Sequence, residues 1–204
     1  MRKPLRFILL LLLLPGMLFA AEPYYDSGSQ IFNITAGFTT PMMYYNPGRN
    51  AQGYEGPELT FFPGSGENNT HHTFGGLGAI SYQVFINPYF AIGGQLGFQF
   101  DFVNSGLVST VVPIFVKATY VPVQGRFEVP LSLGAGLAYI SYDGSSKLTF
   151  GCELEVGARY FITDEWGLGL NASFLVIPEL YSSNTVKMST MMYMPVTLTV
   201  SYRH

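Results

Sequence analysis

Few side chains in this sequence have the types and the spacing that enzyme chemistry requires. The segment NNTHHTF places His71 and His72 directly after Thr70, and Ser81 follows in the next stretch. A histidine base beside a hydroxyl nucleophile is the pair that acyl transfer uses, but nothing in this spacing is specific for such a pair. Joint metal binding by the two histidines is disfavoured, because adjacent residues on a strand point to opposite faces. We therefore expect no enzyme, no metal site and no cofactor.

The charged residues offer a different kind of chemistry. Five of them alternate with apolar neighbours and would share one confined interior: Lys117, Glu128, Glu155, Arg159 and Arg203. Three further polar residues would lie higher in the same interior: Gln95, Asp101 and Glu153. Ionised groups are tolerated in such a space only when they are paired. The pattern predicts one ion-pair network that closes the interior to ions; the alternative is a gate whose pairs exchange partners.

The elements that position these charges are extended strands. In FAIGGQLGFQFDF, residues 90–102, the even positions are bulky and apolar apart from Gly94, and the odd positions are small or polar. This period of two indicates a strand with one apolar face. The same alternation recurs in seven other segments: 31–39, 74–86, 108–120, 126–140, 148–162, 166–176 and 186–202. Each is close to or above the roughly 9–11 residues with which a tilted strand crosses a bilayer.

Composition decides which way the apolar face points. Charged residues make up 11% of the chain, against about 25% in ordinary soluble domains. After residue 21 no apolar run is long enough for a membrane-spanning helix. A barrel whose bulky face is solvated by lipid explains both facts. The net charge of −3 argues against nucleic acid as a partner, and a single cysteine, Cys152, excludes an intrachain disulfide.

The N-terminus has the layout of a secretory signal. Arg2, Lys3 and Arg6 precede the apolar run FILLLLLL, and the small residues of LFAA follow. This order predicts a cleavable signal peptide over residues 1–21, with cleavage after Ala20 or Ala21. An uncleaved anchor is the alternative. Residues 22–204 are then a single domain, an all-β, antiparallel, up-and-down transmembrane barrel of eight strands.

The connections between the segments suggest an orientation in the membrane. Three connections are short: residues 87–89, 121–125 and 163–165. A long first extracellular loop is expected at about 41–72. Short turns on one side and longer loops on the other predict that both termini are periplasmic. Aromatic residues on the bulky face also gather at both strand ends, as membrane interfaces favour.

The first loop is too apolar for an idle solvated loop. Besides many glycines, prolines and asparagines, it contains Met42, Met43, Tyr44, Tyr45, Tyr54, Phe61 and Phe62. Long ordered loops are usually functional. These side chains could line a hydrophobic pocket at the mouth of the barrel, form a contact surface facing a host, or pack on the mouth as a lid.

Three prolines lie inside the predicted strands, on the small and polar face. They are Pro113, Pro130 and Pro195. Proline removes a hydrogen bond from the ladder between strands. Each proline marks either a bulge or local bend, or a break in the wall; Pro113 and Pro130 are the candidates for a sideways opening.

One stretch resembles a known family. VVPIFVKATYVPVQGRFEVPLSLGAGLAYISY, residues 111–142, is similar to the fourth and fifth strands of the OmpW family of small outer-membrane barrels. The matching positions are Pro113, Tyr120, Pro130, Gly134, Ala135, Gly136 and Tyr139. The segment 86–98 and the end VTLTVSYRH are similar to strands shared by OmpW, OmpX and OmpA barrels, although Arg203 and His204 follow the terminal aromatic Tyr202.

The resemblance implies eight antiparallel strands and, for OmpW relatives, passage of small hydrophobic compounds. We therefore expect a narrow channel for such compounds in the bacterial outer membrane. The alternative is an adhesin or interaction protein that acts through the first loop. The expected partners are outer-membrane lipid, the barrel assembly machinery, and either small hydrophobic solutes or host surface ligands, with no nucleic acid.

Overall fold

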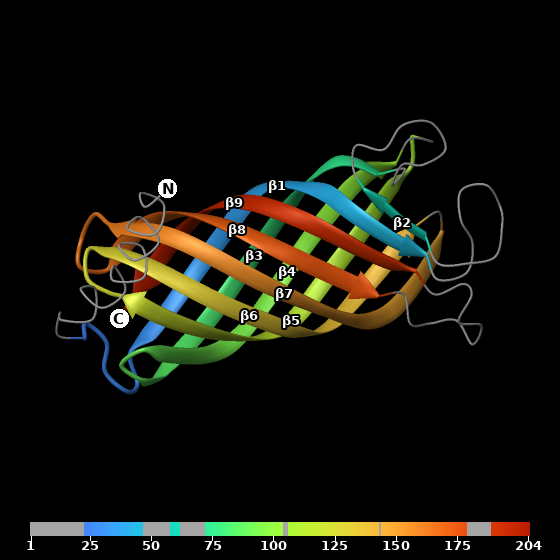
Figure 1. Ribbon diagram of the computed structural model, residues 1–204. Helices are drawn as coiled ribbons and strands as arrows, with labels where there is room; N and C mark the ends of the chain where they lie inside the picture. The colour runs from blue at the N-terminus through green and yellow to red at the C-terminus, as the bar shows by residue number, and fades with distance from the viewer. Residues whose placement is uncertain (1–22, 47–57, 62–71, 104–105, 143, 179–188) are drawn as a thin grey trace, which may run out of the picture.

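The computed structural model describes residues 23–46, 58–61, 72–103, 106–142, 144–178 and 189–204 (Figure 1). The predicted signal peptide lies outside these residues. Within them, no helix has the length and apolar character needed to span a membrane.

The described chain is almost entirely antiparallel strand. The strands are β1 (Gln30–Asn46), β2 (Glu58–Phe61), β3 (His72–Asn87), β4 (Phe90–Val103), β5 (Val108–Val123), β6 (Phe127–Tyr142), β7 (Ser145–Phe161), β8 (Trp166–Pro178) and β9 (Thr190–Arg203). Eight of them pair in the order β1-β3-β4-β5-β6-β7-β8-β9, and β1 also pairs with β9. The sheet therefore closes on itself, and the predicted eight-stranded barrel is confirmed.

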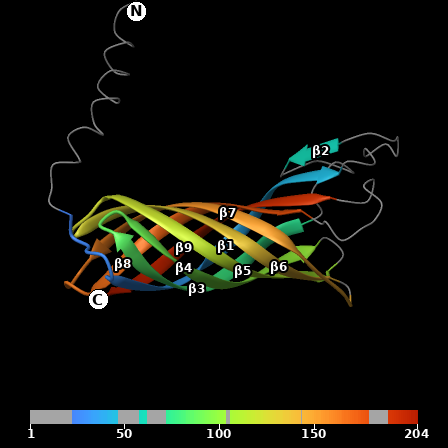
Figure 2. The same ribbon diagram turned by 90° about the horizontal axis from the view of Figure 1, so that it is seen from below.

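The short strand β2 is outside this closed wall. Among the described residues it pairs only with the last residues of β1, from Met43 to Asn46. Figures 1 and 2 show β2 at the opposite end of the barrel from the C-terminus. We call the end with the C-terminus the lower end and the end with β2 the upper end.

The bulky face of the strands points outward, as the composition predicted. In β4, the side chain of Phe98 is 52% exposed, whereas Gln99 and Asp101 are fully buried. Aromatic residues at the lower end form the cross-strand pairs Phe90–Tyr120, Phe127–Tyr160 and Trp166–Tyr202. A belt of aromatic side chains around one end of the barrel is typical of a membrane interface.

Two lumen-facing glycines let neighbouring strands approach each other closely. A Cβ atom on Gly75 or Gly93 would lie within 3.0 Å of the backbone of the neighbouring strand. Such close approach is possible only without a side chain. The small and polar face recognised in the sequence is therefore also the concave face of the barrel.

The predicted first loop begins later than expected. β1 continues to Asn46, and Glu58–Phe61 form β2, so parts of the predicted loop 41–72 are paired strand. A register shift between Pro41 and Met43 changes which residues face inward. Local alternation does not predict this extension, because the bulge interrupts it and β2, which pairs with the extended part, has only four residues. Residues 47–57 and 62–71 lie outside the described part of the chain.

Candidate functional site

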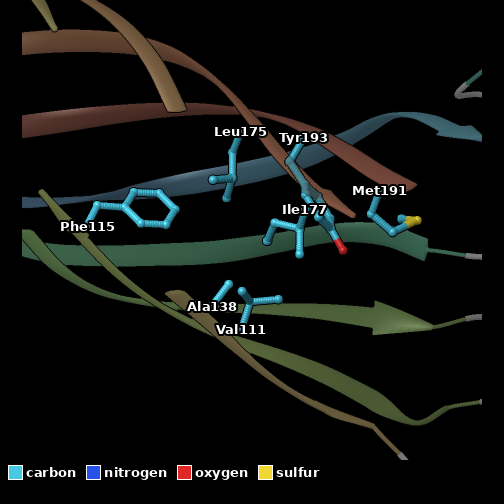
Figure 3. Close-up of a cluster of buried hydrophobic side chains, with 7 residues drawn as sticks. All are labelled: Val111, Phe115, Ala138, Leu175, Ile177, Met191 and Tyr193. Carbon is cyan, nitrogen blue, oxygen red and sulfur yellow. The ribbon is translucent and has the colours of Figure 1, made fainter. Parts of the chain in front are cut away.

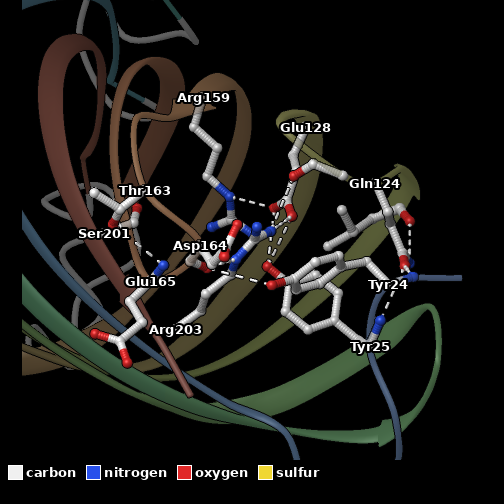
Figure 4. A network of polar contacts seen from close by, with 12 residues as sticks. Tyr24, Tyr25, Gln124, Glu128, Arg159, Thr163, Asp164, Glu165, Ser201 and Arg203 are labelled. Atoms are coloured by element: carbon white, nitrogen blue, oxygen red, sulfur yellow. Dashed lines mark hydrogen bonds and ion pairs between the residues drawn. The ribbon is translucent and has the colours of Figure 1, made fainter.

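The lumen contains an ion-pair cluster near its lower end, which we call the lower cluster (Figure 4). Glu128 on β6 lies opposite Arg159 on β7 in the strand register. The Nε of Arg159 is 2.7 Å from one carboxylate oxygen of Glu128, and Nη1 of Arg203 is 2.7 Å from the other. Glu128 is completely buried. Two guanidinium groups therefore compensate one carboxylate in the interior.

Tyr25, which precedes the first strand, completes the lower cluster. Its hydroxyl donates a hydrogen bond of 2.8 Å to Glu128, and its ring stacks on Phe85 at a centroid distance of 3.9 Å. The backbone N–H of Tyr24 donates to the side-chain oxygen of Gln124, and the guanidinium of Arg203 lies 3.6 Å from the ring centroid of Tyr24. Burial raises the pKa of the Tyr25 hydroxyl above its ordinary value. Residues 24 and 25 thus cap the lower end.

Apolar side chains close the rest of the lower end around this cap. Tyr25 packs in a buried group with Ile31, Phe85, Ala91, Val121 and Phe161. Sequence reasoning missed Tyr25, because a lone aromatic before the first strand has no periodicity that would point it into the lumen.

A second group of charges, the middle cluster, lies higher in the lumen. Nζ of Lys117 is 2.8 Å from an oxygen of Glu155 and donates a hydrogen bond of 2.8 Å to the oxygen of Gln95. The amide nitrogen of Gln95 in turn donates a hydrogen bond of 2.7 Å to Glu153. The middle cluster therefore joins β4, β5 and β7 across the lumen.

The five predicted charges form two clusters rather than the single network expected. Both oxygens of Glu128 are used by Arg159 and Arg203, while Glu155 pairs with Lys117. Glu155 and Arg159 lie four residues apart on β7, with Gly157 between them on the same face. A small polar cavity separates the clusters and leaves about 20 Å³ for the centres of water molecules. This is room for only about one or two waters.

One side of the upper lumen is apolar, which the alternation did not predict. Seven buried side chains from β5, β6, β8 and β9 form the upper apolar cluster (Figure 3): Val111, Phe115, Ala138, Leu175, Ile177, Met191 and Tyr193. Tyr44, one of the predicted loop residues, packs against it. The ring of Phe115 lies over Gly134 and Gly151, where a Cβ atom would come within 3.2 Å and 2.9 Å of it. Phe115 is thus the floor of the cluster.

The other predicted mouth residues are not gathered at one site. Met42 lies at the register shift of β1, while Met43 and Tyr45 lie on the strand beyond it and pair with β2. Tyr54 and Phe62 lie outside the described residues, and only the backbone of Phe61 is described, as part of β2.

The histidine and hydroxyl groups are also far apart where they are described. His72 pairs with Val103 at the upper end of β3, and its ring lies edge-on to that of Tyr193 at a centroid distance of 6.4 Å. Ser81 pairs with Gln95 and accepts a hydrogen bond from Asn33. Nine positions of strand separate His72 from Ser81, about 30 Å. Thr70 and His71 lie outside the described residues.

Pro113 interrupts a ladder without shifting its register. The β4–β5 ladder passes from Leu96–Ile114 to Gln99–Val111, so Gly97 faces Pro113 without a ladder pairing. A Cβ atom on Gly97 would lie 2.8 Å from the ring of Pro113. Pro130 faces Gly157 in the same way on β6 and β7. On the other side of β6, however, the register with β5 shifts between the pairs Tyr120–Leu131 and Val123–Val129, which flank Pro130. Pro113 is therefore a gap in hydrogen bonding, filled by a proline ring on a glycine, whereas Pro130 also lies at a register shift, as a bulge or local bend requires.

Comparison with known proteins identifies relatives and the fold. An uncharacterized protein of Treponema pallidum is 31% identical over 109 residues, which cover 53% of this chain and 50% of the relative. A second uncharacterized protein of that organism is 28% identical over 68 residues, covering 33% of this chain and 23% of the relative. The chain thus spans half or less of the length of these relatives.

The barrel is similar to Neisserial surface protein A, with a TM-score of 0.59. The two chains are 14% identical, and the match covers 86% of this chain and 97% of the other. This likeness supports the fold of an outer-membrane barrel. The model of an uncharacterized protein family matches residues 19–202. The chain therefore belongs to this family and has the eight-stranded fold of bacterial outer-membrane barrels.

Proposed function

We propose that this protein is an OmpW-type outer-membrane channel that takes small apolar solutes into its upper lumen and releases them sideways into the membrane. The observation that carries the proposal is the division of the lumen. The upper half has an apolar side, bounded below by Phe115, and lies above a lower half filled with paired charges. An apolar solute would gain by leaving water for the upper half but has no favourable path through the lower half.

The lower half resists passage for two reasons. A solute would have to separate the middle cluster and then the lower cluster, each of which is buried and paired. Breaking a buried ion pair leaves an uncompensated charge at high cost. The cap formed by Tyr24 and Tyr25 closes the end below them.

A sideways exit has structural support at the seam between β4 and β5. The ladder is interrupted where Gly97 faces Pro113, beside the floor residue Phe115. On the outside, an apolar groove lies next to this interruption and is lined by Tyr82, Gly94, Leu96 and Ile114, among others. Gly94 is the one even position of residues 90–102 without a bulky side chain. A solute that displaced the Pro113 ring would emerge beside this groove.

We further propose that the upper end faces outward and that both termini are periplasmic. The described lower connections between β3 and β4, β5 and β6, and β7 and β8 are short. Outer-membrane barrels place such short turns on the periplasmic side. In this orientation the outer-membrane lipid surrounds the bulky face, and the barrel assembly machinery would insert the chain.

A reversible cross-link tests the exit. Leu96 and Ile114 are register partners across the seam, so Leu96→Cys/Ile114→Cys in a Cys152→Ser background can be oxidised to a disulfide. The matched control is Ala158→Cys/Leu170→Cys, which joins partners on β7 and β8. We expect oxidation to slow uptake of a hydrophobic dye into proteoliposomes only for the seam pair, with recovery after reduction.

Two results would contradict this proposal at different points. Equal uptake by the oxidised and reduced seam variant would exclude the β4–β5 exit. Equal uptake by liposomes with and without the Cys152→Ser protein would exclude a channel for such solutes altogether.

A second candidate function is adhesion through the hairpin of β1 and β2. Tyr45 and Leu59 are cross-strand partners in it, and both side chains are exposed. A pair of exposed apolar residues beyond the barrel wall suits a contact surface. Host-cell or matrix binding that is lost in Tyr45→Ser/Leu59→Ser, with dye uptake unchanged, would favour this function.

A further inference from the structure

One side of the upper lumen carries buried oxygen atoms without partners. Asp101, Gln99 and Thr39 are fully buried. The amide nitrogen of Gln99 donates a hydrogen bond of 2.8 Å to one oxygen of Asp101. Three side-chain oxygens make no hydrogen bond: the other oxygen of Asp101, the amide oxygen of Gln99 and the hydroxyl of Thr39. A buried polar atom without a partner is unfavourable, so three together indicate a missing donor.

The strand register places these oxygens on one patch of the wall. Thr39 on β1 pairs with Gly75 on β3, and Gly75 pairs with Asp101 on β4. Gly75 has no side chain, and the backbone of β4 comes so close that a Cβ atom would not fit there. Thr39 and Asp101 therefore flank a bare and concave strip. We call Thr39, Gln99 and Asp101 the acceptor patch.

The acceptor patch borders the upper apolar cluster. Gln99 pairs with Val111, which belongs to that cluster, and Asp101 pairs with Ser109. None of the ion pairs found among the described residues involves Asp101. The upper lumen is thus apolar on one side and, on the other, rich in acceptors with one uncompensated carboxyl group.

We infer that the upper lumen binds small alkyl- or arylalkylammonium compounds, with the ammonium group on the acceptor patch and the hydrocarbon on the upper apolar cluster. This inference rests on the proposed function and names the solute class it favours. An ammonium group supplies three donors and one positive charge. Its three donors therefore equal in number the three oxygen atoms without partners, and its positive charge would compensate the carboxylate of Asp101.

A divalent metal ion fits the same place poorly. The described residues contain no group of three His, Cys, Asp or Glu side chains that could hold one. A single carboxyl group neutralises one charge, and the upper apolar cluster beside it would strip the water that Mg²⁺ retains. An organic cation, by contrast, can contact the acceptor patch with its charged group and the upper apolar cluster with its hydrocarbon.

Calorimetric titration of the full-length barrel in nanodiscs tests the inference. The probes are hexylammonium and hexan-1-ol, which differ in the head group, and empty nanodiscs provide the blank. In Asp101→Asn, the shape of the side chain is kept and the charge is lost. A hydrogen bond to a charged group contributes enough that we expect about a tenfold or greater loss of hexylammonium affinity. Hexan-1-ol affinity should change less than about twofold.

Two further variants separate the two sides of the site. Asp26→Asn removes an exposed carboxylate outside the barrel and should leave both affinities unchanged. Leu175→Ser alters the upper apolar cluster and should weaken both probes. Retention of the folded form on gel electrophoresis without heating checks each barrel.

The outcomes distinguish this inference from the proposed function. If folded Asp101→Asn binds hexylammonium as tightly as the parent, the acceptor patch does not select cations, although a channel for neutral solutes would stand. Binding of Ca²⁺ that hexylammonium does not displace would also overturn the inference. If neither organic probe binds the parent, the proposed function fails together with it.

Discussion

The hydroxyl of Tyr25 donates a hydrogen bond to the carboxylate of Glu128, although 103 positions separate the two residues. The same carboxylate pairs with Arg159 and Arg203, so one buried anion connects β6, β7, β9 and the segment before β1. The lower end of the barrel therefore depends on Glu128 more than on any of its partners alone.

Replacement of Glu128 by alanine should destabilise the barrel. The substitution leaves Arg159 and Arg203 buried without a carboxylate, and breaking a buried pair in this way costs about 3–5 kcal/mol. Urea unfolding of the protein in lipid vesicles measures the change. Glu165→Gln, at an exposed position in the lower turn, is the matched control; an equal effect of both variants would mean that the lower cluster contributes nothing specific.

Ion leak should require damage to both clusters. The lower and middle clusters lie at different depths on β7 and act in series, so either one can still block the lumen. In planar bilayers we expect Glu128→Ala or Lys117→Met alone to conduct weakly, and the double variant to conduct more than their sum. A Glu128→Ala barrel that conducts as well as the double variant would show that the middle cluster is no barrier.

Stability at alkaline pH should depend on Tyr25. Because burial raises the pKa of this hydroxyl in the folded state, its contribution is complete below the ordinary tyrosine pKa of about 10 and is lost as the pH rises above it. The free energy of unfolding of the parent should therefore fall more between pH 9 and pH 11 than that of Tyr25→Phe. Parallel curves for the two proteins would exclude a role for the hydroxyl.

Cysteine scanning along residues 90–102 should distinguish the lipid-facing positions of β4 from its lumen-facing positions. We expect single cysteines at Phe98 or Phe102 to react with lipid-confined reagents, and those at Gln99 or Asp101 not to react, because only the former point outward. The scan uses Cys152→Ser, since Cys152 is itself exposed. Uniform labelling at all positions would contradict the outward orientation of the bulky face.

The sequence by itself determined the eight strands of the barrel wall and their faces, but not the extension of β1 or the short strand β2. Alternation is a local property: successive side chains on a strand point to opposite sides wherever the strand lies. The exposed Phe98 and the buried Gln99 could therefore be assigned from FAIGGQLGFQFDF and the low charge content of the chain alone. The same alternation identified all five lumen charges, because each shares a face with small neighbours.

Only the tertiary structure decided which of these lumen residues meet. Contacts across a narrow barrel depend on the tilt of the strands and on their stagger, which no single strand encodes. For this reason Glu128 binds both Arg159 and Arg203, while Glu155 binds Lys117 in a separate cluster. The acceptor patch around Asp101 also depends on the tertiary structure. Thr39 lies at the same depth in the lumen as Asp101 only because β1 pairs with β3 and β3 pairs with β4. Tyr25 lies outside every strand, and only the folded chain brings it under the barrel.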